Sequence, residues 1–104
     1  MVTVGLYYDI IPGKGAEFEK KFVDVIEAMQ GIAGHKQSFL YHRVDDHDSY
    51  AIISEWDSKD EFVAFIRSDA FKQVTTWGRE NVLRNAPRHK IYPTAEDLMS
   101  GRPH

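Results

Sequence analysis

The sequence predicts an α+β fold in which an antiparallel four-stranded sheet carries helices on one face. Stretches of alternating apolar and polar residues, typical of strands, are separated by stretches in which apolar residues recur every three or four positions, as on amphipathic helices. These segments follow one another in the order β-α-β-β-α-β. That order is the one found in the ferredoxin-like split unit.

A strand over residues 2–11 and a helix ending near Gly31 make up the first part of the pattern. Along the strand, Tyr8 lies on one face and Tyr7 on the other, so only one of them can face the helices. A Pro-Gly-Lys-Gly turn at residues 12–15 separates strand from helix. The apolar stripe of the helix consists of Phe18, Phe22, Val25, Ile26 and Met29, and its polar face of Glu17, Lys20, Lys21, Asp24 and Glu27.

A hairpin follows, because residues 37–44 and 50–56 are strand-like and five polar residues join them. Both faces of these strands are partly apolar, with Phe39 and Tyr41 on one face and Leu40 on the other. A monomer would leave one face of the sheet in water. We therefore expect a homodimer in which the open faces of two sheets meet and form one barrel.

Two helices are expected after the hairpin. Ser58 and Glu61 form an S-x-x-E capping box, and Ser68 is the expected cap of a second helix that runs to about Leu83. Residues 88–92 offer the last strand. The domain is thus expected over residues 1–93, followed by a C-terminal tail, 94–104, with one capped helical turn at 94–99.

Composition narrows the possible functions. The 104 residues are 42% apolar and 28% charged, as in a globular protein of one domain, and the net charge is −3 with scattered basic residues. Such a chain has no basic face for nucleic acid. It contains no cysteine, no signal-like leader and no apolar run of membrane-spanning length, so we expect a cytoplasmic protein without a membrane partner.

The chain resembles the antibiotic-biosynthesis monooxygenase family of small dimeric α/β barrels. The resemblance covers residues 1–92 and three local signatures: Ile11-Pro12-Gly13-Lys14-Gly15-Ala16-Glu17-Phe18, Glu55-Trp56-Asp57-Ser58-Lys59-Asp60-Glu61-Phe62 and His89-Lys90-Ile91-Tyr92. It implies a pocket between helices and sheet for a small aromatic molecule. Enzymes of the family oxygenate without flavin or metal, or use heme as substrate and cofactor.

Heme degradation, the second reading, is implied by the similar heme-degrading monooxygenases. Their working Asn, Trp and His fall, by ungapped matching, at Tyr8, Phe65 and Thr75. None of the three residue types is kept, and a threonine cannot supply the usual nitrogen ligand to iron. A shifted alignment leaves His89 as a candidate ligand. The resemblance therefore favours a cofactor-independent monooxygenase of phenolic or quinol-like substrates. A binding protein of the same fold without turnover is the third reading.

The candidate catalytic residues are Tyr8, His42 and Trp77, because activation of a phenol needs a base, hydrogen-bond donors and a dry aromatic pocket. The candidate substrate-binding residues are Trp56, Phe65 and Arg79. Each has a structural alternative. Trp56 and Phe65 can simply pack in the core, His42 can be a surface or hydrogen-bonded histidine, and Arg79 suits the negative end of a helix.

No metal site is expected. The hairpin loop brings His42 and His47 near Asp45, Asp46 and Asp48, but their spacing matches no known ligand pattern, and such loops are usually solvated turns. The sequence also contains no dinucleotide fingerprint, phosphate-binding glycine loop or Ser-His-Asp order.

Overall fold

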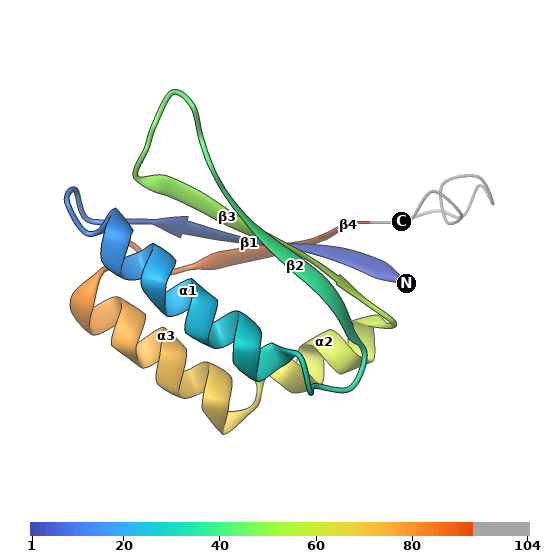
Figure 1. The fold of residues 1–104 in the computed structure, drawn as a ribbon. Coiled ribbons are helices and arrows are strands. Elements are labelled where there is room, and N and C mark those ends of the chain that lie inside the picture. The colour runs from blue at the N-terminus through green and yellow to red at the C-terminus, as the bar shows by residue number, and fades with distance from the viewer. Residues whose placement is uncertain (93–104) are drawn as a thin grey trace.

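The computed structural model describes residues 1–92, except the side chain of Ala28, and confirms the α+β ferredoxin-like class (Figure 1). The C-terminal tail predicted from the sequence, residues 94–104 with a helical turn at 94–99, lies outside the described residues. The elements are β1 (Val2–Asp9), α1 (Gly15–Met29), β2 (His35–His42), β3 (Ser49–Trp56), α2 (Lys59–Ile66), α3 (Asp69–Asn81) and β4 (Arg88–Tyr92).

All three helices cover the same face of the sheet, whose strands lie in the order β2-β3-β1-β4 and are all antiparallel (Figure 1). The central pair is β1 and β3, in a register that places Leu6 opposite Ile52 and Tyr8 opposite Tyr50. Because side chains alternate along a strand, these residues all point toward the helices. The sheet thus presents a row of large apolar side chains to α1, α2 and α3.

The core lies between this row and the helices in two clusters. One contains Trp56 and Phe62, neither of which is exposed to solvent, and the other contains Tyr50 and Phe18. The remaining buried members of the clusters are Val4, Leu6, Ile10, Met29, Ile52, Phe65, Val82 and Leu83.

Two glycines shape the ends of α1. Gly13 and Gly34 have φ angles of +88° and +84°, in the left-handed region that side chains with a Cβ disfavour. The turn at Gly34 brings the chain into β2 at His35, two residues before the predicted start. The carbonyl oxygen of Gly34 accepts a hydrogen bond of 2.7 Å from the Asp57 amide. The early start of β2 follows from this anchoring.

Both predicted helix caps are present. The Ser58 hydroxyl oxygen accepts a bond from the amide of Glu61 at 3.3 Å and donates to the Glu61 carboxylate at 3.1 Å. The Ser68 hydroxyl oxygen accepts from the amide of Phe71 at 3.2 Å and donates to the Phe65 carbonyl at 2.6 Å. Ser68 therefore ends α2 and begins α3, which explains why the helical segment is divided in two.

Substitution Ser58→Ala is expected to lower the free energy of unfolding by about 1 kcal/mol, because it removes the side-chain acceptor for an amide of the first helical turn. Ser58→Asp keeps an acceptor and should stay within a few tenths of a kcal/mol of the parent protein. Urea unfolding followed by circular dichroism measures both. Equal midpoints for the Ala and Asp variants would contradict the capping role.

No helix covers the opposite face of the sheet (Figure 1), and apolar and aromatic side chains of β2 are exposed there. Phe39 is 50% exposed and Tyr41 55% exposed on β2. On β1 and β4, the hydroxyls of Tyr7 and Tyr92 are hydrogen-bonded to each other. We call this surface the open face. No helix within residues 1–92 has the length and apolar character needed to cross a membrane.

Candidate functional site

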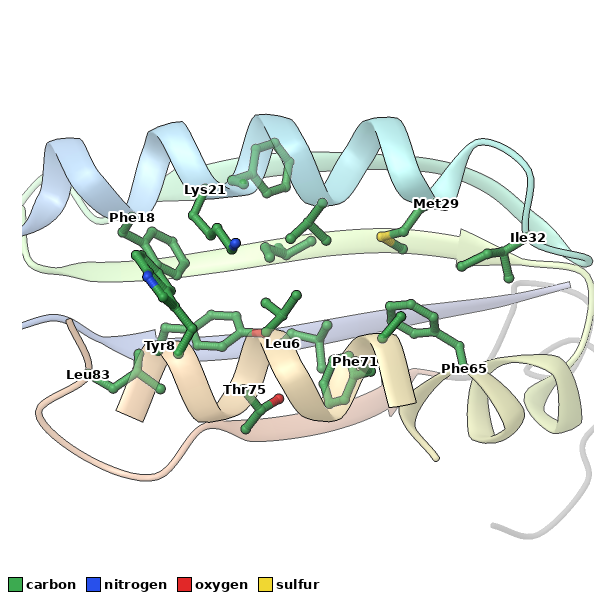
Figure 2. Close-up of a pocket in the computed structure, with 17 residues that line it drawn as sticks. Leu6, Tyr8, Phe18, Lys21, Met29, Ile32, Phe65, Phe71, Thr75 and Leu83 are labelled. Carbon is green, nitrogen blue, oxygen red and sulfur yellow. The ribbon is translucent and has the colours of Figure 1, made fainter. Parts of the chain in front are cut away.

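A cavity of about 290 Å³ lies between α1, α3 and the helix-covered face of the sheet (Figure 2). The sheet contributes Leu6, Tyr8 and Ile52, α1 contributes Phe18, Lys21, Phe22, Val25 and Met29, and α3 contributes Ala70, Phe71, Val74, Thr75, Trp77 and Gly78; Ile32, Phe65 and Leu83 complete the lining.

Four of the lining side chains carry nitrogen or oxygen: Tyr8, Lys21, Thr75 and Trp77. The others are apolar, so the cavity is a hydrophobic chamber with a few polar groups, as is usual for sites that bind small organic molecules. A ligand here would gain most of its affinity from apolar contact and its orientation from these four groups.

Tyr8 is the polar group from the sheet, and its ring packs on Phe18 with the ring centroids 5.2 Å apart. Figure 2 shows its hydroxyl directed into the cavity. Burial raises the pKa of Tyr8 to about 12, because the phenolate would lose its hydration. At neutral pH the hydroxyl therefore keeps its proton and can donate a hydrogen bond, but it is a poor base.

Tyr50 extends this aromatic row at the end of the cavity. Its ring lies 5.0 Å from that of Phe18, and its hydroxyl donates to a carboxylate oxygen of Glu19 at 2.6 Å. Burial and this bond to Glu19 raise the pKa of Tyr50 to about 12. The bond ties β3 to α1 and holds Phe18 between two tyrosines, which keeps Tyr8 in place.

Lys21 and Trp77 face each other from α1 and α3. The ammonium nitrogen of Lys21 lies 5.2 Å from the centroid of the Trp77 ring, within cation–π range. Thr75 lies on α3 beside the cavity, and Figure 2 shows Lys21 reaching into the space between the two helices. These contacts place a positive charge at the cavity.

Tyr8, Trp77 and Phe65 are the predicted site residues that the structure brings together, since all three line the cavity. The positions matched to the heme-degrading branch, Tyr8, Phe65 and Thr75, line this same cavity. Lys21 was assigned to the polar face of its helix and was not among the predicted site residues. The sequence does contain a signal for this position. Lys21 lies three residues after Phe18 and four before Val25, which places it at the edge of the apolar stripe of the helix.

Trp56 does not line the cavity. It is fully buried, and its ring centroid lies 5.3 Å from that of Phe65 and 5.8 Å from that of Phe62. Its indole nitrogen donates to the Ser54 hydroxyl at 3.1 Å. The environment is that of a core residue, which is the structural alternative given for Trp56 above.

His42 and Arg79 also lie outside the cavity. His42 is exposed at the end of β2, where its Nδ1 donates to the carbonyl of Arg43 at 3.1 Å and its ring lies 5.0 Å from that of His47. Strand alternation correctly places His42 on the same face of β2 as Leu40. His42 is, however, the last residue of a strand at the edge of the sheet. Arg79 is exposed in the last turn of α3.

The hairpin loop is organised by its own contacts. Arg43 donates to both carboxylate oxygens of Asp45, at 2.9 and 2.6 Å, and a carboxylate oxygen of Asp46 accepts from the amide of Asp48 at 3.1 Å. Across residues 1–92, no three histidine, aspartate or glutamate side chains are grouped as ligands for one metal ion.

Comparison with curated proteins gives a relative from Haloarcula marismortui, named "Putative heme-binding protein rrnAC3100", that is 37% identical over 87 residues. The match covers 84% of this chain but 13% of that protein. Three further relatives are 33–38% identical over the same length, and the chain spans between 14% and 18% of theirs.

Solved structures share the fold. A conserved protein from Methanosarcina mazei Go1 superposes with a TM-score of 0.79 at 22% identity, covering 89% of this chain and 91% of that one. SnoaB, a cofactor-independent oxygenase from Streptomyces nogalater, superposes with a TM-score of 0.75 at 22% identity and the same coverage. The family model of antibiotic biosynthesis monooxygenases matches residues 1–77, which include β1, α1, the hairpin, α2 and most of α3. The chain therefore belongs to the antibiotic biosynthesis monooxygenase family.

Proposed function

We propose that this protein is a cofactor-independent monooxygenase that oxidises a small phenolic or quinol-like substrate in the cavity between α1, α3 and the sheet. The observation that carries the proposal is the protonated Tyr8 hydroxyl directed into a largely apolar chamber. A volume of about 290 Å³ is at the low end of the roughly 300–1,000 Å³ of small-molecule sites. It suits a compound of few rings.

The chemistry of a quinol balances without a cofactor. A quinol and O₂ give a hydroxyquinone and water: one oxygen atom replaces a ring hydrogen as a new hydroxyl, and the other takes the two phenolic hydrogens and leaves as water. The substrate supplies all the electrons. The protein then has to bind the ring, exclude water and stabilise the negative charge that develops on the substrate oxygen as the ring gives electrons to O₂.

We assign the stabilisation of this negative charge to the hydroxyl of Tyr8. A donor fixed in an apolar chamber stabilises a developing oxyanion more than water does, since it needs no reorganisation during the reaction. The indole of Trp77 and the hydroxyl of Thr75 are further donors at the same cavity. His42, Trp56 and Arg79 have no part in this proposal, because none of them lines the cavity.

Heme, which the names of the curated relatives mention, does not fit the lining of the cavity. Among the described residues that line it there is no histidine or cysteine. Tyr8 could ligate iron only as a phenolate, a form that its apolar surroundings disfavour when no metal is bound. The chain also matches only a small part of those relatives, so their names describe proteins with several times as many residues.

We also propose that the protein is a homodimer joined through the open face. Phe39 and Tyr41 are half exposed there, and Ala51 and Ile53 lie on the same face of the neighbouring strand. Burying such a surface against its own copy removes apolar area from water and closes an isologous interface. The predicted cytoplasmic location stays a prediction.

Oxygen uptake with a panel of substituted hydroquinones tests the oxygenase. Uptake is expected above the rate without protein for at least one of them, and Tyr8→Phe should lower kcat by about a hundredfold, the usual cost of removing one donor to an oxyanion. Phenylalanine keeps the packing on Phe18. Tyr41→Phe, an equivalent change on the open face, is the control and should leave kcat unchanged.

Two results would reject the oxygenase. Uptake equal to the protein-free rate across the panel, with binding of the same compounds shown by calorimetry, would leave a binding protein without turnover. Equal activity of Tyr8→Phe and Tyr41→Phe would show that the Tyr8 hydroxyl has no catalytic role.

A further inference from the structure

We infer that the substrate is an aromatic carboxylate, and that Lys21 is the residue that selects it. The inference rests on the proposed function, since it concerns the ligand of the same cavity. It starts from the charge of the lining: Lys21 is the one charged side chain among the described residues that surround the cavity.

Lys21 is half-buried, and its ammonium group is not paired with any carboxylate of residues 1–92. The acidic residue one turn earlier, Glu17, is paired with Lys14 at 3.2 Å. The neighbouring Lys20, by contrast, is exposed on the outer side of α1. The positive charge of Lys21 is therefore available to a ligand in the cavity.

The position of this charge is held by Trp77. With its nitrogen 5.2 Å from the centroid of the indole ring, the ammonium gains electrostatic attraction from the face of the ring while keeping its hydrogen-bond donors for another partner. A cation that is already placed and partly shielded from water binds an anion more tightly than a freely moving surface lysine does.

The shape of the site then separates the two parts of a ligand. An aromatic ring fits among the helix residues Phe22, Phe65 and Phe71 of the lining, and an ionised group at one end of the ring can reach Lys21. Figure 2 shows Lys21 reaching into the space between α1 and α3. A carboxylate matches best, because it is ionised at neutral pH and accepts the short, charge-assisted bonds that an ammonium donates. A neutral ring of the same size would leave the charge of Lys21 unpaired.

Binding of matched ligands without oxygen tests the inference. Titration calorimetry under argon with 1-hydroxy-2-naphthoate and its methyl ester should give at least about tenfold tighter binding of the acid, the value of one hydrogen bond to a charged group. Lys21→Met, which keeps the length and packing of the side chain, should remove this preference. Lys21→Arg should restore most of it, and Lys20→Met should leave it unchanged.

The inference would be contradicted if the parent protein, Lys21→Met and the reference variant Lys20→Met all bound the acid with the same dissociation constant. This result would mean that Lys21 only covers the apolar surface with its stem, and it would overturn the inference. Failure of the acid to bind the parent protein would overturn it too.

Oxygen uptake with 2,5-dihydroxybenzoate and its methyl ester separates this inference from the proposed function. Faster oxidation of the acid, with the difference lost in Lys21→Met, supports both. Equal oxidation of acid and ester by the parent protein and by Lys21→Met overturns the inference and leaves the oxygenase standing. No oxidation of either, together with Lys21-dependent binding of the naphthoate, supports the ligand class and counts against the oxygenase.

Discussion

Replacing Trp56 with alanine is expected to lower the free energy of unfolding by about 3–5 kcal/mol, the usual cost of removing a buried large aromatic side chain. Trp56 has no exposed surface, and its ring packs on Phe62 and Phe65. The substitution opens a cavity between β3 and α2. It also removes the donor to the hydroxyl of Ser54, which is itself 1% exposed and would have to find another partner.

This loss is a large share of the roughly 5–15 kcal/mol that stabilises a domain. If the alanine variant does not fold, Trp56→Phe gives a milder version, since it keeps much of the packing and loses the indole donor. Thermal and urea unfolding, followed by circular dichroism, measure both variants. A free energy of unfolding for Trp56→Phe equal to that of the parent protein would contradict the importance of the bond to Ser54.

Trp77 provides the matched control, because it is the other tryptophan of the chain and lines the cavity instead of the core. Trp77→Ala should cost less stability than Trp56→Ala and should weaken ligand binding more. The reverse order would contradict the division made here, in which Trp56 supports the fold and Trp77 contributes to the site.

The contrast between these two tryptophans shows what the sequence could predict. The spacing of apolar residues and the capping residues predict the helices and strands well. Residues 88–92 form a strand as predicted, and Ser58 and Ser68 cap α2 and α3. Such signals are local, because each depends on neighbouring residues and on bonds within one turn. Strand alternation likewise predicts that only one of Tyr7 and Tyr8 faces the helices, and in the structure Tyr8 is the one that lines the cavity.

The depth of a residue in the fold is not a local property, and this is where prediction from sequence failed to separate the candidates. Tyr8 and His42 both point to the helix side of the sheet, but β1 is central and β2 is at the edge, so only Tyr8 lies beneath the helices. Lys21 differs from its prediction in the opposite direction, because it lines the cavity although it was expected on the polar face of α1. Its charge predicts exposure, yet the gap between α1 and α3 lets its side chain turn toward Trp77.

A charged substitution on the open face is expected to weaken the proposed dimer strongly. In sedimentation equilibrium, the parent protein should have twice the 12.0 kDa mass of the chain, and Phe39→Asp should shift the equilibrium toward the monomer. Phe39 is 50% exposed in the single chain and lies opposite Ile53 in the pairing of β2 with β3, so in the proposed dimer its ring is buried against the open face of the second copy. An aspartate there would have to lose its hydration without a partner.

The expected size of this effect is a dissociation constant raised by at least about thirtyfold, since an aromatic residue that anchors an interface typically contributes about 2 kcal/mol or more. Val23→Asp is the control. Val23 is 55% exposed on α1, on the helical side of the molecule, so the same charge placed there should leave the dimer intact. A parent protein that sediments with the mass of one chain at all concentrations would refute the dimer. Equal association of the two aspartate variants would instead move the interface away from the open face, because only Phe39 belongs to it.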